Sequence, residues 1–125
     1  MVSNSTKDKI RKAKKHYFGR NCIGTALYIT KRQPHDVAIE PEDFDVNSFG
    51  LVEVHEPRIE AIAIWDYFSL MEIRRRVLHM GVVTHLNPTL VTHRPGYNRS
   101  LIENESIGDI SEGYPCPARF YLPSR

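Results

Sequence analysis

The sequence predicts a single α+β domain in which N-terminal helices pack on a small antiparallel sheet. The chain has 125 residues, of which 41% are hydrophobic, and this composition suits one modest core. Segments with helical spacing come first along the chain. Short apolar runs separated by turn residues follow them. Helices that precede a series of antiparallel strands are typical of the α+β class.

Two helices are expected near the N-terminus. The first runs from Ser5 to Tyr17, with Ser5 as its N-cap and with basic residues toward its end, where the helix dipole favours cations. The second runs from Cys22 to about Lys31. It should end before Pro34, because a proline disfavours helical backbone at the residue that precedes it.

The remainder of the chain is expected to consist mainly of strands. The apolar run 61–65 should be buried on both faces, and Asn87-Pro88 predicts a turn between two strands that form a hairpin. The spacing in residues 69–76 is ambiguous and allows a short helix. The expected strands are 49–54, 61–65, 79–85 and 90–94, with weaker candidates at 99–105 and 118–122.

Charge and hydropathy exclude some classes of protein. The net charge is +2, and much of the basic excess lies between Lys7 and Lys15, a pattern that usually marks a solvated helix face, so nucleic acid is not an expected partner. No apolar run is long enough to span a membrane. The first residues lack the apolar core of a secretory signal, so the chain is expected to be cytoplasmic at synthesis.

The two cysteines differ in their surroundings. Without a secretory context both are expected to be free thiols. Cys116 lies between Pro115 and Pro117, where no helix can begin. Cys22 begins the second expected helix, where unpaired backbone N–H groups and the helix dipole favour the thiolate. Cys22 is therefore the candidate nucleophile and the thiol expected to react first.

Two histidines follow in an order that suits a catalytic triad. His79 begins one strand of the expected hairpin and His93 lies in the other. The segment Val83-Thr84-His85 recurs as Val91-Thr92-His93, and strand alternation places His79 and His85 on the same face. Alternation alone therefore does not decide between these two histidines.

These motifs resemble those of the NlpC-type cysteine peptidases, which are cell-wall amidases of the papain-like superfamily. Asn21-Cys22-Ile23-Gly24 stands where the family has an aspartate, cysteine, serine and glycine at the start of its first core helix. The run from His79 to Thr84, the turn, and the run from Val91 to Gly96 follow the family's second signature. Ala118 to Tyr121 is similar to its last strand. The likeness extends over most of the chain from Tyr17 onward.

The resemblance implies a papain-like fold, with a basic helix at 1–16 and one catalytic domain at 17–125. It implies a hydrolase of amide bonds in peptidoglycan stem peptides that needs no cofactor or metal. Cys22 would be the nucleophile, His79 the base and His93 the residue that orients it. The Cys22 N–H would donate to the oxyanion, and Tyr17 would line the substrate pocket. Lysis, a phage particle or a secretion apparatus would deliver such an enzyme to the wall.

Several alternatives remain open from the sequence. Cys22 is a small apolar side chain that suits a core position, and a protein with this fold can serve only for binding or structural assembly. The same three residues also suit an acyltransferase or a deamidase. A zinc site built from His79, His85 and His93 with Cys22 or Glu53 is a further alternative. The sequence does not indicate an oligomeric state.

Overall fold

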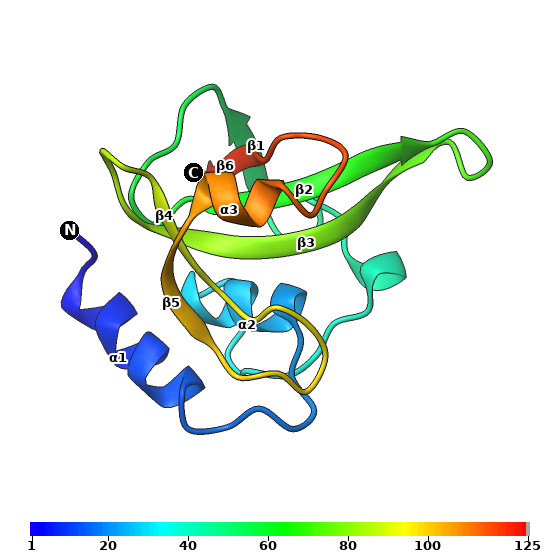
Figure 1. Cartoon of the computed structure of the whole chain (residues 1–125). Coiled ribbons are helices and arrows are strands. Elements are labelled where there is room, and N and C mark those ends of the chain that lie inside the picture. Colours follow the sequence, from blue (N-terminus) through cyan, green and yellow to red (C-terminus); the bar gives the residue numbers. More distant parts are fainter. Residues whose placement is uncertain (125) are drawn as a thin grey trace.

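The computed structural model describes residues 1–124 and has an α+β fold. Figure 1 shows the chain as a ribbon. In order, its elements are α1 (Asn4–Ala13), α2 (Cys22–Ile29), the 3-10 helix η1 (Pro41–Asp43), β1 (Leu51–Val54), β2 (Ile62–Ser69), β3 (Arg74–His85), β4 (Leu90–His93), β5 (Ile102–Ser106), α3 (Ile107–Ser111) and β6 (Arg119–Pro123).

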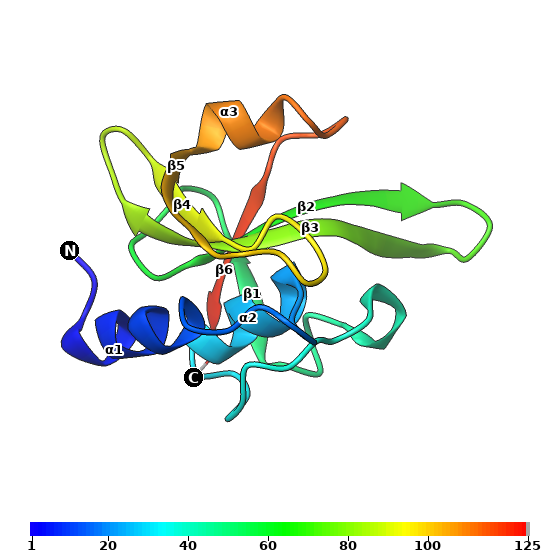
Figure 2. The same ribbon diagram turned by 60° about the horizontal axis from the view of Figure 1, so that its bottom comes forward.

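The strands form one six-stranded sheet, and the helices lie on both of its faces. The strand order is β1-β6-β2-β3-β4-β5, and neighbouring strands are antiparallel. Helices α1 and α2 lie below the sheet in Figure 2, whereas α3 lies above it. The predicted α+β class is therefore confirmed. No helix within residues 1–124 has the length and apolar character needed to cross a bilayer.

Both N-terminal helices form, with bounds that depend on their caps. Helix α1 begins earlier than predicted, because the Ser3 side chain, and not that of Ser5, accepts a hydrogen bond from the Thr6 N–H. Helix α2 begins at Cys22 as predicted, and the Asn21 side chain accepts from the Gly24 N–H at 2.9 Å. A Cβ atom at Gly24 would lie 1.8 Å from the Val37 carbonyl oxygen, so only glycine fits at this position.

The predicted strands are present, but the helix allowed at 69–76 is wrong. Residues 62–69 and 74–85 form a long antiparallel hairpin whose outer part projects from the body of the protein in both views (Figures 1 and 2). The apolar side chains of 69–76 face solvent, so their spacing does not reflect a buried helix face. The predicted hairpin of β3 and β4 is confirmed, while α3 and η1 were not predicted.

The core has two parts, one on each face of the sheet. Helix α2 packs on Ile62, Ile64, Met80 and Val82, and Ile10 of α1 belongs to the same cluster. The opposite face carries a second cluster that α3 covers: Ala61, Ala63, Trp65, Val83, Val91 and Ile110. Residues 61–65 are buried on both faces, as predicted, because consecutive side chains enter different clusters.

A buried arginine connects the helices to the sheet. The Arg94 side chain is 0% exposed and follows directly after β4. Its guanidinium donates to the carbonyl oxygens of Ala13, His16 and Arg99. It also donates to Thr25 Oγ1 and Asp36 Oδ2, at 2.8 and 3.1 Å. Five hydrogen-bond donors are thus matched by five acceptors from four segments.

Replacing Arg94 should destabilise the whole domain. Arg94→Lys keeps the charge but cannot reproduce the planar donor fork, so several buried acceptors lose their partners. We expect the free energy of unfolding to fall by about 3 kcal/mol. Urea denaturation measures this change. The exposed Arg99→Lys serves as the control and should change the value by less than about 0.5 kcal/mol.

Candidate active site

Two of the predicted residues, His79 and His93, are in direct contact. His93 also forms a hydrogen bond with a carboxylate. His79 lies in β3 and His93 in β4, and both side chains are buried. The distance from His79 Nε2 to His93 Nδ1 is 2.7 Å. The distance from His93 Nε2 to Glu105 Oε1 of β5 is 2.6 Å. Three neighbouring strands therefore carry one chain of hydrogen bonds, the His79–His93–Glu105 relay.

The relay determines which nitrogen of His79 is free to accept a proton. A carboxylate only accepts hydrogen bonds, so His93 Nε2 carries the proton that faces Glu105. With both rings neutral, His93 Nδ1 then accepts from the N–H at His79 Nε2. His79 Nδ1 is left with a free lone pair, and it makes no hydrogen bond within residues 1–124. The geometry therefore favours Nδ1 as the proton acceptor.

Aromatic side chains enclose His79 and hold it neutral. The Tyr114 ring stacks on the His79 ring with an interplanar angle of 7°. The centroids of the Trp65 and His79 rings are 5.4 Å apart. The Trp65 Nε1–H donates to Ser111 Oγ, which fixes α3 above the imidazole. Burial, and secondly the positive charge of a protonated His93, lower the pKa of His79 from 6.5 to about 3.

The Cys22 thiol lies against the backbone of β3, but as a thiol rather than the predicted thiolate. Burial raises its pKa, and this effect exceeds the opposing effect of nearby N–H groups of Met80, Ile23 and Cys22 itself. The N–H groups at the helix start thus lower the pKa of Cys22, as predicted, but desolvation raises it by more. The exposed Cys116 is more accessible, so the expected preference of a small alkylating agent for Cys22 is not supported.

In the described residues Cys22 and His79 make no hydrogen bond to each other. Cys22 packs against the α2 side of the sheet, together with Met80. The His79 ring contacts Trp65 and Tyr114 on the other side. Burial raises the pKa of Tyr114, and the charge of a Cys22 thiolate adds to this shift. Proton transfer from the thiol to His79 therefore requires these side chains to rearrange.

A cavity of about 350 Å³ opens beside the relay. Its lining includes His79, His93, Glu105, Asp109 and Tyr114. The predicted pocket residue Tyr17 does not line this cavity. Its ring is largely exposed in the loop between α1 and α2.

His85, the remaining histidine of the β3–β4 hairpin, is not part of the relay. A β-bulge falls between Val83 and His85, so the strict alternation that placed His85 on the face of His79 is interrupted. The His85 side chain is exposed, and its Nδ1 lies 3.0 Å from the Pro88 carbonyl oxygen. No group of three Cys, His, Asp or Glu side chains in residues 1–124 is arranged to hold a metal ion. The positions of the three histidines therefore do not support the zinc site that the sequence left open.

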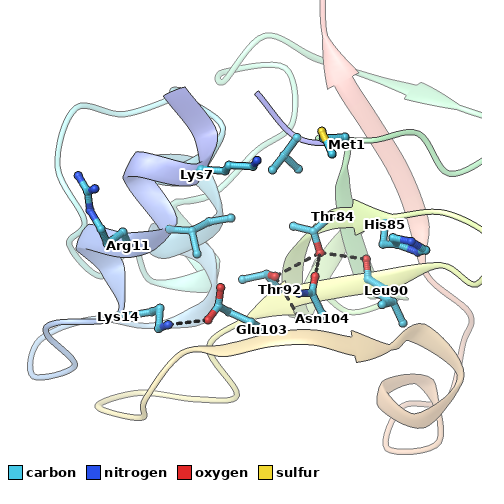
Figure 3. Close-up of a pocket in the computed structure, with 12 residues that line it drawn as sticks. Met1, Lys7, Arg11, Lys14, Thr84, His85, Leu90, Thr92, Glu103 and Asn104 are labelled. Atoms are coloured by element: carbon cyan, nitrogen blue, oxygen red, sulfur yellow. Dashed lines mark hydrogen bonds and ion pairs between the residues drawn. The ribbon is translucent and has the colours of Figure 1, made fainter. Parts of the chain in front are cut away.

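A larger cavity, of about 410 Å³, lies between α1 and the sheet and is shown in Figure 3. Thr84 and Asn104 are joined by a hydrogen bond in its floor. Lys14 forms an ion pair with Glu103 at its rim. The described residues that line this cavity include His85 but neither cysteine. The described lining of the smaller cavity does not include Cys22 either, but it includes His79 and His93, so the smaller cavity is the better candidate.

Sequence reasoning missed two residues of the site. Glu105 was placed in a weak strand candidate, and the pairing of β5 with β4 brings it to His93. Tyr114 lies in the loop after α3 and carries no motif. Glu105 could have been found as an acid on a strand next to a predicted histidine strand. Nothing in the sequence signals Tyr114.

Comparisons with known proteins add no family assignment. A scan of protein-family models, a search of curated proteins and a search of solved structures each found no match to this chain. The likeness to NlpC-type peptidases therefore rests on the sequence motifs alone.

The buried neutral His79 should make stability depend on pH. Since its pKa is 6.5 when unfolded and about 3 when folded, the unfolded chain binds more protons between these values. The contribution of neutral His79 to the free energy of unfolding should therefore be complete above pH 6.5. It should decline as the pH falls toward 3, by on the order of 3–5 kcal/mol. His79→Gln should flatten this decline. Urea denaturation at several pH values measures it, and His85→Gln, the control, should follow the wild type.

Proposed function

We propose that this protein is a cysteine-dependent amide hydrolase of papain-like type, with Cys22 as nucleophile and His79 as base. The observation that carries the proposal is the His79–His93–Glu105 relay, which leaves His79 Nδ1 free to accept a proton. The position of Cys22 at the start of α2, against the β3 backbone at Met80, the residue after His79, supports it. Peptidoglycan stem peptides are the proposed substrate, from the sequence resemblance.

In the first half-reaction the thiol attacks the carbonyl carbon of the substrate amide. Cys22 Sγ forms the C–S bond while its proton moves to His79 Nδ1, and the carbonyl electron pair moves onto oxygen. The Cys22 N–H at the start of α2 donates a hydrogen bond to that oxyanion. The intermediate then collapses, the C–N bond breaks, and His79 returns the proton to the leaving amine. A thioester on Cys22 remains.

In the second half-reaction water replaces the amine. His79 Nδ1 takes a proton as water adds to the thioester carbon, and the C–S bond then breaks. The proton returns to Cys22, and the carboxylic acid leaves. Glu105 stabilises the positive charge that the histidine pair holds while His79 is protonated, and His93 keeps the imidazole in the required tautomer.

The pKa shifts favour a neutral resting pair over a preformed ion pair. The pKa of Cys22 is raised and that of His79 is lowered, so neither group is charged near pH 7. His79 therefore acts as a general base during attack. Catalytic hydrogen bonds often shorten only when substrate binds, so a resting state without a Cys22–His79 bond is compatible with this role.

A direct test follows muropeptide hydrolysis by mass spectrometry. Wild-type protein should cleave an amide bond in the stem peptide and accumulate a covalent adduct on Cys22. Cys22→Ala and His79→Ala should each reduce the rate by at least about a thousandfold. His93→Asn should retain more activity than His93→Ala, because asparagine keeps a hydrogen-bonding group. Cys116→Ser is the matched control and should retain the wild-type rate, while circular dichroism checks folding.

Hydrolysis that persists in the Cys22→Ala variant would exclude the proposed nucleophile. Transfer of the acyl group to an added amine in preference to water would instead identify an acyltransferase with the same residues.

Glu105 should act as a positioning residue through His93. Glu105→Gln keeps an acceptor for His93 Nε2–H but loses the charge, so kcat should fall about tenfold with little change in KM. Glu105→Leu should reduce kcat by at least about a hundredfold, because the tautomer is no longer fixed. Removing the carboxylate charge should also move the acidic limb of the kcat/KM profile to lower pH.

The matched control for Glu105 is Glu103→Gln. Glu103 lies on the same strand but pairs with Lys14 at 2.8 Å, away from the histidines. Its rate and pH profile should equal those of the wild type. An unchanged pH profile in Glu105→Gln would show that the carboxylate has only a structural role.

The raised pKa of Cys22 also favours a second candidate function, which is a non-catalytic binding or assembly protein with the same fold. A partly buried, protonated cysteine is typical of a core position. In that case the wild type and Cys22→Ala would be equally inert on muropeptides and would bind a partner equally well.

A further inference from the structure

The β2–β3 hairpin extends well beyond the sheet and carries an unusual surface. We define residues 66–77 as the hairpin arm. It projects from the body of the protein, away from α1 and α3, in both views (Figures 1 and 2). The arm begins where a β-bulge between Trp65 and Asp66 separates it from the buried part of the hairpin. Asp66 and Val77 at the base of the arm still pack against the body of the protein, whereas the residues at its apex face solvent.

The apex of the arm exposes large apolar side chains. Leu70, Met71 and Ile73 are 84%, 96% and 77% exposed, so water covers most of each side chain. Ile73 has φ +52°, a conformation that a β-branched residue rarely adopts. Strain of this kind persists mainly at functional positions. A contiguous apolar tip that faces solvent indicates an interaction site.

Aromatic and cationic side chains form the next level below this tip. Phe68 pairs with Arg75, Tyr67 with Arg76, and Ser69 with Arg74 in the antiparallel register. Phe68 and Tyr67 are roughly half exposed. Successive residues of a strand point to opposite faces, so both faces of the arm carry an aromatic ring and an arginine at the same height. The side chains of the arm are thus apolar at the tip, and aromatic and cationic at the next level below it.

This order matches the layers of a lipid bilayer surface. Apolar side chains enter the acyl boundary, aromatic rings lie at the headgroup level, and arginines contact lipid phosphates. A protein groove would select one face of the hairpin. A planar surface instead accepts both faces at once, which is how the groups are distributed here.

We propose that the apex of the hairpin arm inserts into a bilayer that contains anionic phospholipids, with Arg74, Arg75 and Arg76 at the phosphates. The arm has three arginines against two acids, Asp66 and Glu72. Arg75 is paired with Asp66 at 3.1 Å, and Arg76 is paired with Glu72 at 2.8 Å and with Glu42 of η1 at 3.9 Å. Within residues 1–124, Arg74 is the one arginine of the arm without an ion pair, and it donates to the Glu42 carbonyl oxygen at 3.4 Å, so the cationic excess is small. Binding should therefore be reversible and should need the apolar tip as well as the charge.

Vesicle sedimentation tests this proposal with defined lipids. Full-length protein should sediment with vesicles of phosphatidylcholine and phosphatidylglycerol and much less with phosphatidylcholine alone. The triple variant Leu70→Ser, Met71→Ser, Ile73→Ser should bind at least about tenfold more weakly, because its tip can no longer enter the bilayer. Arg74→Gln should weaken binding to the anionic vesicles by about fivefold. Cys22→Ala should bind like the wild type, so the result is independent of catalysis.

The control double variant is Val37→Ser, Val52→Ser, in which two exposed apolar side chains away from the arm are removed. It should bind like the wild type. Met71→Trp adds a second tryptophan, and its emission should shift to the blue and be quenched by brominated lipid. The native Trp65 is buried about 20 Å from the tip at the usual strand rise, so it serves as the unquenched internal reference.

Several outcomes would overturn the proposal. These are failure of the wild type to bind anionic vesicles, equal binding to neutral and anionic vesicles, equal loss in the control double variant, or no quenching of Met71→Trp. Self-association that is lost in the triple variant, without vesicle binding, would assign the tip to a second copy of the chain and would also overturn it.

Discussion

The buried guanidinium of Arg94 is the interaction on which the arrangement of the structure depends. It connects the end of α1, the side of α2 and the loop at Asp36 to the residue that follows His93. A charged group with no exposed surface is stable only where its donors are matched, so these segments cannot shift independently. Because α2 begins at Cys22, the same contacts fix the candidate nucleophile relative to the histidine strand. The distance between the candidate nucleophile and the candidate base is thus a property of the core rather than of a flexible loop.

The site divides between the two faces of the sheet. Burial keeps Cys22 protonated on the α2 side and His79 neutral on the α3 side. Charge is held only at the solvent end, where Glu105 is partly exposed and His93 Nε2 donates to it. A site built in this way stores no ion pair, since separated charges are costly in a buried environment. Charge would develop only during proton transfer, when Glu105 is positioned to stabilise it.

The elements that were predicted correctly have strong local signals. Apolar runs with turn residues between them predicted the strands from 61 to 94, and Asn21 and Cys22 predicted the start of α2. The helix allowed at 69–76 failed because helical spacing implies a buried face, whereas Leu70, Met71 and Ile73 face solvent. The thiolate prediction failed for a related reason: a helix start can be read from the sequence, but the degree of burial around Cys22 cannot. Glu105 reaches His93 only through pairing of β5 with β4, which is a long-range contact without a local pattern.

Strand β3 joins the two features that have functional proposals. Its outer half carries Arg74, Arg75 and Arg76, and its inner half carries His79 and Met80. Six residues separate Ile73 from His79, which corresponds to about 20 Å along an extended strand. If the apex lies at a bilayer surface, the relay lies above the headgroups and not within the acyl region. The substrate would then present its scissile bond in the aqueous layer next to the membrane, and the Trp65–His79 pair at the base of the arm would mark the boundary between the binding element and the catalytic core.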